Sequence, residues 1–133
     1  MAITKDITVN QGANHVEVFT IEVLTDQSLP YNAATNPYIP LNLSTATIQM
    51  QVRPSYITST VTLTATDLNG RIVKTDPTNG TFELRIAPDD LVLVKGNALE
   101  LHYLYDLMIT LSADNVIKVS EGNFNVIRQI TRI

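Results

Sequence analysis

The sequence predicts an all-β domain, an antiparallel β-sandwich with one short helical turn, on the basis of three observations. Apolar and polar residues alternate along most of the chain, a pattern that is typical of strands with one buried face. Asn, Asp and Gly residues that tolerate a positive φ separate the alternating runs. Outside residues 87–97, no segment keeps the period of a helix. With 133 residues, the chain fits a single domain that spans residues 1–133.

The first strands are read from the alternation near the N-terminus. We expect one strand at about residues 3–9 and another at 15–23, separated by the turn sequence NQGAN. In the second run, HVEVFTIEV, the alternation changes phase between Val18 and Phe19. A phase change inside a strand predicts a β-bulge or a change of sheet at that point.

Residues 25–41, TDQSLPYNAATNPYIPL, lack any strand or helix pattern and contain three Pro and two Tyr. A connection of this length without regular structure is uncommon in a compact domain and is often functional. Tyr31, Tyr38 and Ile39 supply apolar side chains that can pack. We therefore expect a long ordered loop or arm here, and we propose these three residues as interface candidates.

The remaining segments predict further strands and the helical turn. In residues 87–97, Pro and Asp near the start and Gly near the end predict a helical turn. The sequence ADN at 113–115 predicts the turn of a tight hairpin. Strands are expected at residues 45–53, 60–66, 81–86, 99–111 and 116–122.

The strand LHYLYDLMITL, residues 101–111, has apolar residues on both faces. One face is a continuous apolar stripe, whereas the other carries Leu104 and Met108 beside Asp106. A face that meets water is usually polar, so we expect something to cover this one. The cover could be the loop at 25–41, another strand of the same chain or a neighbouring subunit. Leu104 and Met108 are therefore interface candidates.

Composition narrows the functional classes. The 13 acidic and 9 basic residues give a net charge of −4, and the basic residues are scattered, so we expect no nucleic-acid partner. The absence of Cys excludes Cys nucleophiles and Cys-ligated zinc. No apolar run approaches the roughly 20 residues of a membrane helix, so we expect no membrane partner. The N-terminal segment lacks the apolar region of a signal peptide.

Candidate catalytic and metal-binding residues do not form a known motif. His15 and His102 lie on different predicted strands, and neither has a metal-binding spacing. No Ser lies in GxSxG, and there is no phosphate-binding glycine motif and no dense acidic array for calcium. Asp106, in mid-strand, is expected to be held by a backbone N–H or an Arg rather than to act in catalysis. We therefore expect no enzyme activity, no cofactor and no metal.

Four stretches, taken in order, resemble a known family. They are ITVNQGANHVEVFTIEV, LNLSTATIQMQVRP, NGTFELRIAPDDLVLV and YDLMITLSADNVIKVSEGNFNVIRQITR. Their order is similar to that of small phage virion domains related to the N-terminal domain of upper baseplate proteins of tailed phages. The chain departs from that pattern at Asn42, where the family often has Asp, and at Thr45, where it often has Gly. The matching positions are Tyr105, Asp106, Leu107, Gly122, Val126, Thr131 and Arg132.

The resemblance implies an Ig-like β-sandwich that is a non-enzymatic structural protein of a virion, made in the host cytoplasm. Its place would be the tail, the baseplate or the tail-fibre region, where it would bind other virion structural proteins in a homo- or hetero-oligomer. The family domain often precedes a receptor-binding region. Because this chain stops at TRI, we expect an adaptor or attachment subunit instead. The alternatives are a head decoration or neck protein, and a glycan-binding β-sandwich module that uses Tyr31, Tyr38 or Tyr56.

The C-terminal segment RQITRI completes the set of interface candidates. Its apolar Ile130 and Ile133, on either side of Arg132, suit docking on the sheet edge of a neighbour. A last edge strand of the same sandwich is the alternative for this segment. The full set of interface candidates is Tyr31, Tyr38, Ile39, Leu104, Met108, Ile130, Arg132 and Ile133.

Overall fold

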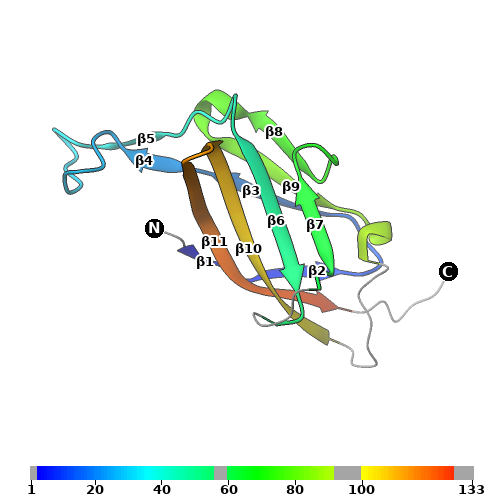
Figure 1. Cartoon of the computed structure of the whole chain (residues 1–133). Coiled ribbons are helices and arrows are strands. Elements are labelled where there is room, and N and C mark those ends of the chain that lie inside the picture. The colour runs from blue at the N-terminus through cyan, green and yellow to red at the C-terminus, as the bar shows by residue number, and fades with distance from the viewer. Residues whose placement is uncertain (1–2, 56–59, 92–99, 128–133) are drawn as a thin grey trace.

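A computed structural model describes residues 3–55, 60–91 and 100–127 and shows an all-β protein, which confirms the predicted fold class (Figure 1). The six-stranded sheet has the order β1 (Ile3–Thr4), β11 (Asn115–Ile127), β10 (Glu100–Ser112), β6 (Thr47–Arg53), β7 (Leu63–Thr66), and β2 (Ile7–Asn10) also pairs with β11. The three-stranded sheet has the order β3 (His15–Thr20), β9 (Thr81–Ile86), β8 (Ile72–Asp76). A separate two-stranded hairpin consists of β4 (Glu22–Leu24) and β5 (Tyr38–Pro40).

The two larger sheets share one hydrophobic core. The six-stranded sheet contributes residues such as Ile48 and Leu107, and the three-stranded sheet contributes Phe19 and Phe82, whose rings stack with centroids 5.2 Å apart. Alternate residues of β6 and β9 are buried, as their sequence period predicts. The finer likeness to an Ig-like sandwich stays a prediction.

A buried hydroxyl group ties the N-terminal segment to the six-stranded sheet. Tyr105 on β10 is 2 % exposed, and its hydroxyl donates to the Lys5 carbonyl oxygen at 2.6 Å and lies 2.7 Å from Ser120 Oγ. At Gly122 on β11, a Cβ atom would lie 2.4 Å from the same Lys5 carbonyl oxygen. Only Gly allows this close approach, which lets β1 and β2 pair in parallel with β11 on either side of Lys5.

Strand boundaries near the N-terminus differ from those predicted. The strand expected at 3–9 is divided into β1 and β2, and the strand expected at 15–23 is divided into β3 and β4. Because β3 pairs with β9 in continuous register up to Thr20, the chain changes sheet after Thr20 and not between Val18 and Phe19. The location predicted for the phase change is therefore wrong by two residues.

The inner side of β3 carries a paired carboxylate. Val16 and Val18 face solvent, and Glu17 lies on the opposite side of the strand. Glu17 Oε2 lies 2.9 Å from Lys5 Nζ, and Glu17 Oε1 lies 3.1 Å from His15 Nε2. Burial raises the pKa of Glu17, but the hydrogen bonds and charges of Lys5 and His15 outweigh it and hold the pKa below the ordinary 4.5.

The expected helical turn is present as the 3-10 turn η2 (Pro88–Leu91), and residues 92–99 lie outside the described part of the chain. A second 3-10 turn, η1 (Pro77–Asn79), begins with Pro77, the residue directly after the end of β8. The prediction of a single helical turn is therefore wrong. The predicted hairpin is confirmed, because β10 and β11 pair antiparallel up to Ser112 and Asn115.

Candidate functional site

The arm, which we define as residues 22–40, projects from the body of the protein beyond the end of β3 (Figure 1). At its base, β4 and β5 pair Glu22 with Pro40 and Leu24 with Tyr38. Farther out, Asn32 and Asn36 form an isolated bridge, with N–H to carbonyl oxygen distances of 3.0 and 2.7 Å. Residues 25–40 of the long loop or arm expected at 25–41 thus belong to an arm whose base is a short hairpin.

Asn36 is the polar centre of the arm. Its side chain is buried, with the residue only 3 % exposed. The Nδ2 group donates to the carbonyl oxygens of Asp26, Leu29 and Pro30 at 2.9, 3.1 and 3.0 Å. The Oδ1 atom accepts from the Asp26 N–H at 2.7 Å. The single side-chain amide of Asn36 therefore holds the segment 26–30 against the part of the arm that leads back to β5.

Two further side chains shape the turns of the arm. The Asp26 carboxylate accepts from the Ser28 hydroxyl at 2.6 Å and from the Ser28 N–H at 3.0 Å, and these bonds lower the pKa of Asp26. Asn32 Oδ1 accepts from the N–H groups of Ala34 and Thr35 at 2.9 and 3.2 Å. Both are the local side-chain to backbone bonds that fix tight turns.

The arm presents its large apolar side chains to solvent. Leu29, Tyr31, Tyr38 and Ile39 are 54, 53, 51 and 42 % exposed. The rings of Tyr31 and Tyr38 stack with centroids 5.0 Å apart. The structure thus brings Tyr31 and Tyr38 together and adds the exposed Leu29, which was not among the candidates, and the interface role of these residues stays a prediction.

Leu104 and Met108 lie half-buried on the outer face of the six-stranded sheet. Leu104 lines a hollow of about 170 Å³, and Met108 lines another of about 430 Å³. Asp106, which lies between these two residues on β10, lines both hollows. The described residues around these hollows come from β6, β7, β10, β11 and the connections that flank them, and none comes from the arm. The alternative in which the loop at 25–41 covers this face is therefore wrong.

The polar candidates are explained individually. His102 Nδ1 lies 2.7 Å from Asn125 Oδ1 across the β10–β11 pair. The carboxylate of Asp106 has no hydrogen bond or ion pair with any residue that the structure describes, so the expected bond to a backbone N–H or an Arg is wrong. Among the described residues, no group of three or more His, Cys, Asp or Glu is placed to hold a metal ion.

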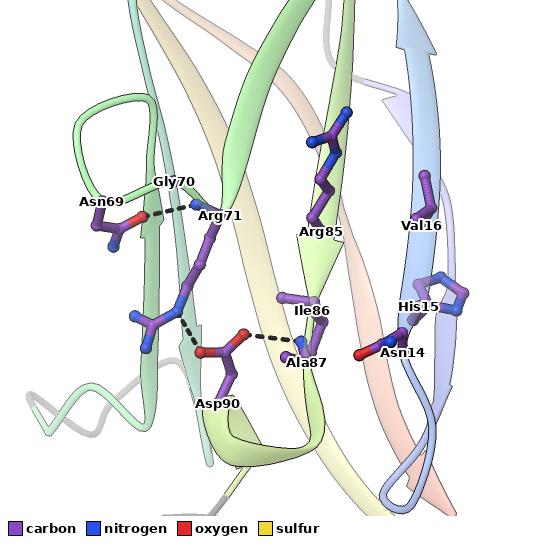
Figure 2. Close-up of a pocket in the computed structure, with 10 residues that line it drawn as sticks. All are labelled: Asn14, His15, Val16, Asn69, Gly70, Arg71, Arg85, Ile86, Ala87 and Asp90. Atoms are coloured by element: carbon purple, nitrogen blue, oxygen red, sulfur yellow. Dashed lines mark hydrogen bonds and ion pairs between the residues drawn. The ribbon is translucent and has the colours of Figure 1, made fainter.

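A hollow of about 450 Å³ opens between the start of β3, the start of β8 and the end of β9 (Figure 2). Arg71 Nε lies 2.8 Å from Asp90 Oδ1, and the Ala87 N–H donates to Asp90 Oδ2 at 2.8 Å. Arg71 also donates to the Thr64 carbonyl oxygen at 2.8 Å, and Arg85 is paired with Glu83. These charged groups therefore already have partners within the protein. The hollow lies at the junction where the ends of the strands meet.

The other candidates and the comparisons complete the site. Tyr56, Ile130, Arg132 and Ile133 lie outside the described residues, so their predicted roles stay predictions. In the described part of the chain, no helix has the length and apolar character needed to cross a membrane. A scan against protein-family models and a search of curated proteins find no match to this chain.

Proposed function

We propose that this protein is a non-enzymatic structural subunit of a tailed-phage particle, held by neighbouring virion proteins through its arm. Its place in this proposal is the tail, the baseplate or the tail-fibre region. The order of sequence motifs, from the N-terminal NQGAN turn to the closing hairpin, supports the phage assignment. The arm supports the mode of binding.

One observation carries the proposal: the arm is ordered by polar bonds while its apolar side chains stay in solvent. Ordering the backbone costs conformational entropy, and the hydrogen bonds of Asn36, Asp26 and Asn32 offset part of this cost. Because the arm is ordered before it binds, it loses less conformational entropy on binding than a flexible segment would. Stacked Tyr31 and Tyr38 are of the residue type that most often dominates protein interfaces.

The test combines a surface variant with particle analysis. Tyr31→Ser with Tyr38→Ser removes both rings from exposed positions, so we expect the purified chain to keep its thermal midpoint. We expect at least a tenfold loss of the variant from purified particles when it replaces the wild-type chain. Leu68→Ser is the matched control, because Leu68 is 90 % exposed on a different turn. Equal incorporation of both variants contradicts the role of the arm.

Localisation on the particle tests the other half of the proposal. Gold-labelled antibody against the purified chain should mark the tail or baseplate of intact particles in electron micrographs. Label on the head or neck contradicts the tail placement and favours the decoration or neck alternative. Particles that lack the protein altogether contradict the virion role.

A further inference from the structure

Among the residues that the structure describes, no strand pairs with the outer side of β3, so the three-stranded sheet has an open edge there. The hydrogen-bond pattern shows which backbone groups face this edge. The Arg85 N–H donates to the Arg71 carbonyl oxygen at 2.7 Å, so β9 bonds to β8 through its odd-numbered residues. The even-numbered residues of β9 therefore bond to β3, and they pair with residues 15, 17 and 19. Consequently, Val16, Val18 and Thr20 direct their N–H and C=O groups away from β9.

The same edge continues along β4. The Ile21 N–H donates to the Gly80 carbonyl oxygen at 2.9 Å, and the Ile21 carbonyl oxygen accepts from the Leu41 N–H at 2.9 Å. Both groups of Ile21 therefore point away from the open edge. Thr25 donates its N–H to the Pro37 carbonyl oxygen at 3.0 Å. By alternation, Glu22 and Leu24 face the same open edge as Val18. Residues 16–24 thus form one continuous edge, roughly 30 Å long at the rise of a strand, and Figure 1 shows β4 leading on from β3.

The other edges of the two larger sheets, in the described part of the chain, carry features that block pairing. β8 has Lys74 in its middle and a register shift against β9. On β7, the Thr64 carbonyl oxygen already accepts from Asn69 Nδ2 and Arg71 Nη1. β1 and β2 are two short, separate pieces. In contrast, residues 16–24, VEVFTIEVL, contain no Lys, Arg, Pro or Gly, and Val16 and Val18 are each 54 % exposed.

We propose that this edge pairs antiparallel with the same edge of a second copy and forms a two-fold symmetric dimer. If the axis passes beside Thr20, the full edge is used: Val16 lies opposite Leu24 of the second copy, and Val18 lies opposite Glu22 of the second copy. The edge is complementary to itself in this register, because neither Glu17 nor Glu22 meets a like charge. The edge buries no free carboxylate at Glu17, since Lys5 pairs with it at 2.9 Å.

This dimer is a property of the isolated chain and does not depend on the proposed role in a phage particle. It joins two three-stranded sheets into one continuous sheet across the two-fold axis. On the outer face of that sheet, Val16 lies beside Leu24 and Val18 beside Glu22 of the second copy, which removes part of the apolar surface of both valines from water.

Sedimentation equilibrium of purified variants tests the pairing. Val18→Pro removes an N–H that points to the open edge, so the β3–β9 bonds stay intact while edge pairing is blocked. Thr20→Lys places two ammonium groups opposite each other at the axis, because Thr20 is exposed and pairs with Thr20 of the second copy in this register. Val116→Lys is the matched control, because Val116 is 50 % exposed on the other sheet. We expect wild type and Val116→Lys to dimerise, and both Val18→Pro and Thr20→Lys to stay folded with dimer dissociation constants raised at least 100-fold.

Cross-linking tests the register. The chain has no Cys, so Thr20→Cys introduces one thiol per copy. Directly paired residues lie about 5.5 Å apart between Cα atoms, within the range of a disulfide. Diamide should oxidise the two thiols to one disulfide and be reduced to its hydrazine, whereas Leu68→Cys should stay uncross-linked. A wild type that is monomeric at ~1 mM, a Val18→Pro or Thr20→Lys chain that still dimerises, or a Thr20→Cys chain that does not cross-link overturns the proposal.

Discussion

Replacing Asn36 with Ala should release the arm while leaving the two-sheet core intact. The amide of Asn36 contacts four backbone groups, but its Nδ2 has two hydrogens for three carbonyl oxygens, so about three full bonds are lost. At about 0.5–1.5 kcal/mol per hydrogen bond, the loss is roughly 2–4 kcal/mol. Since 1.4 kcal/mol is a factor of ten, local opening of the arm should become about 30- to 900-fold more frequent.

Amide hydrogen exchange followed by NMR measures this opening residue by residue. The reporters are the N–H groups of Asp26, Asn32 and Thr25, each of which donates within the arm. We expect these amides to lose protection in Asn36→Ala, while amides of the central strands β6 and β10 keep theirs. Asn42→Ala is the control, because Asn42 accepts one bond from the Ser44 N–H outside the arm. If the arm amides stay protected in Asn36→Ala, the reasoning about a polar centre is refuted.

Two further predictions concern the stability of the whole chain. Tyr105→Phe removes the hydroxyl between Lys5 and the buried Ser120, so calorimetry should show a loss of about 1–3 kcal/mol, whereas Tyr38→Phe, at an exposed ring, should change little. Glu17→Gln should remove the stabilisation that Glu17 gains from its lowered pKa, which is present above the unfolded value of 4.5 and lost as the pH falls through the folded value. Denaturant unfolding at pH 7 and pH 3 should therefore show a difference between wild type and Glu17→Gln that shrinks in acid, and an unchanged difference contradicts the pairing of Glu17 with Lys5.

Alternation predicts the fold where one face of a strand meets the core and the other meets water. In β6, the residues Ile48, Met50 and Val52 are buried as their period indicates. The same rule fails for β3, because Glu17 takes the inner side with Lys5 as its partner. That partner lies 12 residues earlier in the chain, on a connection whose position is fixed by the Tyr105 hydroxyl, so no local pattern reveals it.

The candidate site could be predicted in part. The composition of residues 25–41 predicts an ordered loop or arm with Tyr31 and Tyr38 as interface candidates, and in the structure these two rings stack on the arm. The role of Asn36 could not be read, because its partners are backbone groups whose positions depend on the turns at Asp26 and Asn32. The open edge at residues 16–24 is also invisible in the sequence, since it depends on which strand pairs with β9.

Photo-cross-linking in purified particles tests most directly whether neighbouring proteins hold the arm. A photoreactive phenylalanine analogue in place of Tyr31 should cross-link to one defined virion protein, identified by mass spectrometry. The same analogue at Leu68, on a separate exposed turn, should cross-link to that protein at least tenfold less. Equal cross-linking at both positions, or none at Tyr31 in particles that contain the chain, would contradict the proposed role of the arm.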